Sequence, residues 1–128
     1  MLNTVLVMIG GAIGAALRYQ LGRASLRIMG PGYPWGTLAA NVLGGLAMGL
    51  VAGWLAARYQ GQQGEQIRLL VAVGLLGGFT TFSAFSLETM LMIERGEALN
   101  ALGYVLLSVA ASIGALALGL TLMRSATA

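Results

Sequence analysis

The sequence contains no cysteine, histidine, aspartate or lysine, and these absences exclude whole classes of chemistry. Without cysteine or histidine there is no zinc or haem site of the ordinary kind, no disulfide framework and no Ser-His or Cys-His nucleophile. Without aspartate, an aspartyl-phosphate intermediate cannot form. We therefore expect that the protein is not an enzyme, because the sequence offers no plausible pair of nucleophile and base.

Charge is scarce as well. Seven arginines and four glutamates make up 9% of the 128 residues, whereas 58% are hydrophobic. A soluble domain carries about 25% charged residues, so this chain has too little polar surface to cover itself in water. We expect it to lie in a lipid membrane. Its arginines are scattered rather than clustered, so the sequence predicts no nucleic-acid partner.

Four stretches are long and apolar enough to cross a bilayer, which takes about 20 residues. The connections between them leave no room for a soluble domain. The sequence therefore predicts one domain over residues 1–128, an all-α membrane protein with four transmembrane helices. The first span lacks the marks of a cleaved signal peptide, so we expect it to be retained. The predicted spans are Leu2–Leu21, Trp35–Ala57, Ile67–Ile93 and Leu99–Met123, and the connections are Arg23–Pro34, Arg58–Gln66 and Glu94–Ala98.

The arginines are divided almost evenly between the two sides of this predicted bundle. The side of the N-terminus holds Arg58, Arg68 and Arg124, and the other side holds Arg18, Arg23, Arg27 and Arg95. Positive residues bias the orientation of a membrane protein, and a balanced count directs it weakly. Two alternatives follow: a fixed topology set by the three arginines of the first span and its connection, or a dual topology in which copies insert both ways and pair antiparallel.

Small and polar residues recur every four positions in two spans. The second span carries such a stripe at Thr37, Asn41, Gly45, Gly49 and Gly53, and the fourth carries one at Tyr104, Ser108 and Ser112. We expect the glycines, like the Gly10–Gly14 pair of the first span, to pack helices closely. The amide of Asn41 either joins helices or meets a solute. The hydroxyls either bond back to their own helix or form a polar track.

The third span contains a run that favours a broken helix: GLLGGFTTFSAFSLE, from Gly74 to Glu88. Paired glycines followed by hydroxyl residues are typical of such a break. The membrane tolerates it only where it is buried in protein or lines a cavity. We expect the third helix to be broken near its middle, with freed carbonyl groups available to a cation. The alternative is an unbroken helix whose glycines pack on a neighbour.

Two aromatic residues and an acid follow the predicted break. Phe82 and Phe85 are three residues apart and project from one helix face, with Ser83 and Ser86 alongside. The positive edges of their rings would suit a small anion; otherwise the rings are packing bulk. Glu88 is the only acid well inside a span, which makes it a functional candidate, unless it lies near the membrane interface.

Three runs resemble the Fluc/CrcB family of bacterial fluoride channels: GGAIGAALRY (Gly10–Tyr19), GTLAANVLGG (Gly36–Gly45) and the Gly74–Glu88 run. The resemblance extends over the whole chain, and GGFTTFS with its downstream Phe and Glu is the most specific part. It implies a fluoride-selective channel that exports fluoride passively across the bacterial inner (plasma) membrane. It also implies an antiparallel, dual-topology homodimer with two pores and a structural sodium ion at its centre.

The resemblance further implies roles for individual residues. Main-chain carbonyls of Gly77 and Thr80 would bind the sodium ion, and the ring edges of Phe82 and Phe85 would face fluoride. Arg18, expected toward the end of the first span, would attract anions to a vestibule. The remaining positions of the fluoride path would be Asn41, Ser83, Ser86, Glu88, Tyr104, Ser108 and Ser112. These are neutral donors apart from Glu88, and a mid-span cation would hold the anion too firmly.

The sequence departs from the family pattern at one position, and two other functions compete with the fluoride channel. Ala84 stands where the family usually has threonine, so that hydroxyl is dispensable or is replaced by Ser83, Ser86 or water. A small multidrug transporter also has four helices and a dual-topology dimer, but it needs an acid in the first helix, which this chain lacks. A structural subunit or lysis-type pore would explain the glycines but not the aligned polar residues.

Overall fold

The computed structural model describes residues 1–58 and 61–127, and every element in this part of the chain is a helix. Residues 59 and 60 of the predicted Arg58–Gln66 connection and residue 128 lie outside the described residues. Within the described part, four helical segments are long and apolar enough to cross a membrane, which confirms the predicted number of spans. The elements are α1 (Leu2–Met29), α2 (Trp35–Arg58), α3 (Gln62–Ile67), the π-helix η1 (Arg68–Leu76), α4 (Gly77–Phe79), α5 (Ser83–Glu94) and α6 (Ala98–Thr127).

Several predicted helix ends were wrong, most of all the end of the first span. α1 continues past the predicted Leu21 to Met29, because arginine is a good helix former and does not end a helix by being polar. The helix ends where Gly30 adopts a positive φ of 82°, a conformation that glycine tolerates. The third span begins at Gln62 instead of Ile67, and its π-helical turns were not predicted.

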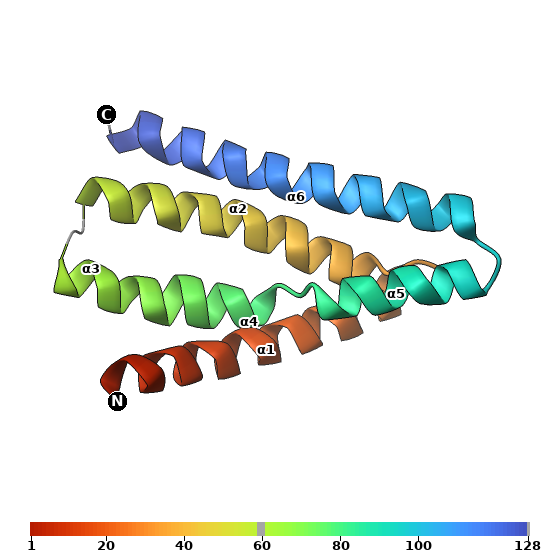
Figure 1. Ribbon diagram of the computed structural model, residues 1–128, viewed down its shortest axis with the longest axis horizontal. Helices are drawn as coiled ribbons and strands as arrows, with labels where there is room; N and C mark the ends of the chain where they lie inside the picture. The colour runs from red at the N-terminus through yellow and green to blue at the C-terminus, as the bar shows by residue number, and fades with distance from the viewer. Residues whose placement is uncertain (59–60, 128) are drawn as a thin grey trace.

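The spans lie side by side and form two helix pairs (Figure 1). From top to bottom the view shows α6, α2, the third span and α1, with both termini at the left end. α2 packs most extensively on α6, and α1 packs on η1 and α4. The turns between α1 and α2 and between α5 and α6 therefore lie together at the opposite end of the molecule.

The predicted glycine stripes lie where backbones approach each other most closely. A Cβ atom added to Gly49 of α2 would collide with the carbonyl oxygen of Leu116 in α6. A Cβ atom on Gly14 of α1 would collide with the carbonyl oxygen of Leu75 in η1. Small residues permit this approach in membrane helices, so the packing interpretation of these glycines is confirmed.

The third span is broken near its middle, as predicted. α4 ends at Phe79, Thr80 has an extended backbone with φ −85° and ψ 161°, and α5 begins at Ser83. Figure 1 shows the interruption as a short non-helical stretch between α4 and α5. Because α1 and α2 pack against the first half of this span, the break is held between neighbouring helices.

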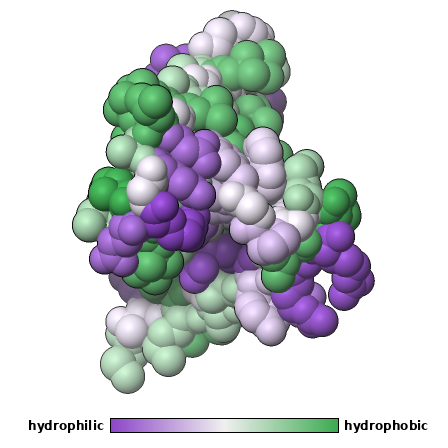
Figure 2. Space-filling model, turned by 90° about the vertical axis from the view of Figure 1, so that its right-hand side faces the viewer, coloured by the Kyte–Doolittle hydropathy of each residue, from purple (hydrophilic) through white to green (hydrophobic). Residues whose placement is uncertain are grey.

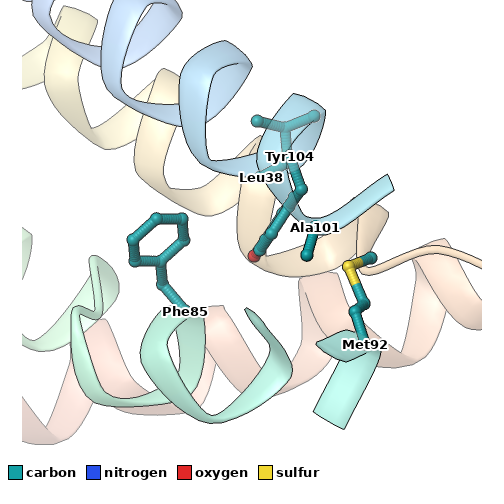
Figure 3. Close-up of a cluster of buried hydrophobic side chains, with 5 residues drawn as sticks. All are labelled: Leu38, Phe85, Met92, Ala101 and Tyr104. Carbon is teal, nitrogen blue, oxygen red and sulfur yellow. The ribbon is translucent and has the colours of Figure 1, made fainter. Parts of the chain in front are cut away.

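The buried core is small and lies toward the end of the molecule that carries the two short turns. It consists of Leu38, Phe85, Met92, Ala101 and Tyr104 (Figure 3). Figure 2 looks onto that end and shows hydrophilic residues gathered there, with hydrophobic side chains above and below. Many large apolar side chains point outward from the single chain, among them Leu106 and Ile113 of α6. Such a surface is stable in lipid or against another protein.

Candidate functional site

The side chain of Asn41 holds the backbone of the break. Its amide nitrogen donates to the carbonyl oxygen of Thr81 at 3.0 Å, and its amide oxygen accepts from the N–H of Thr81 at 2.8 Å. α2 positions Asn41 beside the break because the neighbouring Gly44 leaves room for Thr80 and Phe79. One side chain thus satisfies both polar groups of a backbone residue that the interruption removes from helical bonding.

The break also deprives two carbonyl groups of their usual donors. In an unbroken helix, Gly77 would accept from the N–H of Thr81, and Thr80 would accept from the N–H of Ala84. Here the N–H of Thr81 donates to Asn41, and the N–H of Ala84 donates to the hydroxyl of Thr81 at 3.1 Å. Carbonyl oxygens that lose their helical donors are suitable ligands for a hard cation such as sodium.

A cavity of about 480 Å³ opens beside the break. Residues of α2, α5 and α6 line it, together with residues of α4 and of the segment between α4 and α5. Seven of the residues singled out from the sequence meet here: Asn41, Gly77, Thr80, Phe82, Phe85, Ser108 and Ser112. α2, α6 and the residues around the break thus bring donors and aromatic rings around one space.

The two phenylalanines contact each other but differ in burial. Their ring centroids are 5.6 Å apart, with planes inclined by 49°. Phe85, in the first turn of α5, is 9% exposed, whereas Phe82 precedes the helix and is 77% exposed in the single chain. Phe82 therefore carries a large apolar surface that this chain leaves uncovered.

Three hydroxyl groups of α6 are buried without a partner. Within the described residues, the hydroxyls of Tyr104, Ser108 and Ser112 are inaccessible and make no hydrogen bond. Their spacing of four places them on one helix face, as the sequence predicted. A buried polar group without a partner is costly. This row can therefore supply donors to water or to an ion, instead of bonding back to its own helix.

A second cavity, of about 300 Å³, lies at the end that carries the two short turns. Glu88 of α5 lines it, and its carboxylate accepts a hydrogen bond from the hydroxyl of Thr37 in α2 at 2.5 Å. Thr37 and Asn41 are one turn apart on the same helix face. The second helix therefore presents one polar side chain to the acid and another to the break.

Four predicted site residues line neither cavity: Arg18, Ser83, Ser86 and Tyr104, whose ring packs beside that of Phe85. The hydroxyl of Ser86 donates to the carbonyl of Phe82 at 2.8 Å, and the hydroxyl of Ser83 lies 3.3 Å from that of Thr81. The expected position of Arg18 toward the end of its span was wrong, because α1 is longer than predicted. Its Nε donates to the carbonyl oxygen of Gly78, 3.4 Å away, so a cation lies next to the break.

Sequence reasoning missed three residues of the site. Thr81 was noted only as part of the break, although a threonine pair after GGF could have indicated a cap for the following helix. Thr37 was placed in the polar stripe but not matched with Glu88. Tyr33, which lines the second cavity, stands between glycines and prolines and gave no periodic signal.

Comparison with known proteins finds a matching family and relatives over nearly the whole chain. The family model described as CrcB-like protein, Camphor Resistance (CrcB), matches residues 5–120. Three curated relatives are each named fluoride-specific ion channel FluC. The chain is 58% identical to the one from Phenylobacterium zucineum over 120 residues, 94% of both chains. It is 53% identical to the one from Mesorhizobium japonicum over 125 residues, 98% of both chains. It is 52% identical to the one from Novosphingobium aromaticivorans over 126 residues, 97% of this chain and 98% of the relative. With four apolar spans, a broken third helix and matches of this extent, the chain belongs to the CrcB-like family.

Proposed function

We propose that this multi-pass membrane protein is a fluoride-selective channel of the bacterial inner membrane, through which fluoride leaves the cell passively. The relatives' names support fluoride as the ion. The observation that carries the proposal is the row of buried, unpartnered hydroxyls, two of which, on Ser108 and Ser112, line one cavity together with two phenylalanine residues. Neutral donors and ring edges suit an anion that must shed and regain its water.

The proposed path joins the cavity beside the break, the inner cavity, to the cavity lined by Glu88, the outer cavity. Fluoride is small and strongly hydrated, so each water that it loses must be replaced by a donor. Ser108, Ser112 and Tyr104 offer hydroxyl hydrogens, and Phe85 offers the positive edge of its ring. Neutral donors replace water without binding the ion so tightly that it cannot leave.

A structural sodium ion and a second, antiparallel copy complete the proposal. Among the described residues no group of three or more His, Cys, Asp and Glu could hold a metal. The carbonyls of Gly77 and Thr80, without their helical donors, are the oxygens that fit sodium. Phe82 is 77% exposed beside them, and a second copy on this face would cover its ring and supply a second path.

A proton-coupled transporter for cationic drugs has less support. None of the relatives reported above carries such a name, and Glu88, the only acid well inside a span, is already engaged by Thr37. We expect liposomes with the purified protein to release fluoride and to retain a cationic dye under a proton gradient. Proton-driven dye movement without fluoride release would favour the transporter.

We expect both orientations of the protein in one membrane. With Arg18 beside the break, three arginines remain at each end: Arg23, Arg27 and Arg95 at one, and Arg58, Arg68 and Arg124 at the other. An even count directs insertion to neither side. A cysteine added at the C-terminus should be labelled by an impermeant reagent from both sides. Labelling from one side alone would contradict dual topology and the antiparallel pairing with it.

A further inference from the structure

Tyr33, in the turn between α1 and α2, begins a chain of aromatic rings that reaches the break. Its ring meets that of Tyr104 edge-on, with centroids 5.5 Å apart and planes at 89°. Tyr104 also contacts Phe85, at 5.2 Å between centroids, and Phe85 contacts Phe82 at 5.6 Å. A residue of the turn thus contacts the ring whose hydroxyl is buried and unpartnered in the described structure.

Tyr104 lines neither cavity but contacts a lining residue of each. The outer cavity is lined by Tyr33, Thr37 and Glu88, and the inner one is lined by Phe85 among others. Tyr104 is 0% exposed and packs against a residue of each set. Figure 3 shows Phe85 and Tyr104 in one cluster, with the hydroxyl oxygen of Tyr104 on the side of α5. Tyr104 therefore joins residues of the two cavities through its ring contacts.

The backbone around Tyr33 is suited to holding its ring in place. Pro34 follows it and restricts its conformation, and the N–H of Trp35 donates to its carbonyl oxygen at 2.8 Å. The Trp35 ring packs on the Tyr33 ring, with centroids 4.6 Å apart. The ring is therefore supported on one side by Trp35 and contacts Tyr104 in an edge-on geometry that aromatic quadrupoles favour.

We propose that Tyr33 is a positioning residue for ion passage, and this inference rests on the proposed function. Its ring holds the Tyr104 ring so that the Tyr104 hydroxyl faces the route between the two cavities. Tyr33 does not touch the ion. Without its ring, Tyr104 tilts into the space of the outer cavity, and its hydroxyl no longer replaces a water of the passing ion.

A double-mutant cycle on fluoride release from liposomes tests this inference. Tyr33→Leu should lower the rate about tenfold, as Tyr104→Phe should, because each removes one donor from the route. Tyr33→Phe keeps the ring and should stay within about twofold of wild type. The double variant Tyr33→Leu/Tyr104→Phe should be no slower than Tyr104→Phe alone, because coupled residues are not additive. Tyr19→Leu, at an exposed tyrosine of α1, is the matched control and should leave the rate unchanged.

The remaining outcomes separate this inference from the proposed function. Suppose that wild type releases fluoride and that Tyr33→Leu releases it at the same rate. The inference is then wrong, but the proposed channel function is not affected. The same holds if the rate reductions of Tyr33→Leu and Tyr104→Phe multiply in the double variant. An unchanged rate in Tyr104→Phe also overturns it. If wild type releases no fluoride, both fail. Should Tyr33→Leu not assemble, Tyr33→Met takes its place, because its flexible side chain fills irregular space without a ring.

Discussion

Replacing Phe85 with isoleucine is expected to lower fluoride flux at least about tenfold, which corresponds to about 1.4 kcal/mol lost at the barrier. Isoleucine keeps bulk and apolarity but removes the aromatic ring, with its positive edge, from the lining of the cavity. The same change at Phe82, whose ring contacts that of Phe85, should act likewise. The measurement is fluoride release from liposomes that contain equal amounts of folded dimer.

Phe79→Ile is the matched control for these variants. Phe79 ends α4 on the other side of the break and packs near Gly44. If the rings of Phe82 and Phe85 only fill space, their replacement should have the same effect as that of Phe79. Each variant should then lose at most about 1.5 kcal/mol of stability and keep nearly normal fluoride flux. Near-normal flux in folded Phe82→Ile and Phe85→Ile would place the ion path elsewhere.

Asn41→Leu is expected to abolish the response of the protein to sodium. Leucine cannot accept the N–H of Thr81, so this N–H becomes free to return to the carbonyl of Gly77 and to occupy a proposed sodium ligand. A bound ion present at 100 times its dissociation constant stabilises a protein by about 2.7 kcal/mol. Thermal unfolding of the detergent-solubilised wild type should therefore shift upward when sodium replaces a large organic cation, and that of Asn41→Leu should not.

Thr121→Val serves as the control for Asn41→Leu. The hydroxyl of Thr121 donates to the carbonyl of Ala117 at 2.8 Å, an ordinary bond within α6 and away from the break. This variant should keep the full sodium response. A wild type that unfolds identically in both salts, and transports equally well without sodium, would rule out the cation site. A full response in Asn41→Leu would show that Asn41 does not free the Gly77 carbonyl.

The four spans and the break in the third could be predicted because local sequence patterns cause them. Long apolar runs gave the four spans, and the Gly77–Ser83 run gave the break, because paired glycines and hydroxyls weaken a helix wherever they occur. The end of α1 could not be predicted in this way. Polarity at Arg23 and Arg27 indicated a loop, whereas the helix continues to the first residue with a left-handed backbone, Gly30.

Partners across helices were harder to predict than positions on one helix. The spacing of Tyr104, Ser108 and Ser112 placed three hydroxyls on one face. The spacing of polar residues in α2 could not indicate that the amide of Asn41 bonds to the backbone of Thr81 and not to a solute. That pairing depends on how α2 lies against the broken helix. For the same reason, the contact of Thr37 with Glu88 and the position of Arg18 beside Gly78 became visible only in three dimensions.

The most direct test of the account is the anion selectivity of the purified protein in liposomes loaded with equal fluoride and chloride. Electrodes for the two anions record their release after a potassium ionophore compensates the charge. The account predicts rapid, passive fluoride release that needs no proton gradient, whereas chloride is retained. The reason is that the hydroxyls of Ser108 and Tyr104 and the ring edge of Phe85 replace the water that fluoride loses. Release of both anions at similar rates, or of neither, would contradict it.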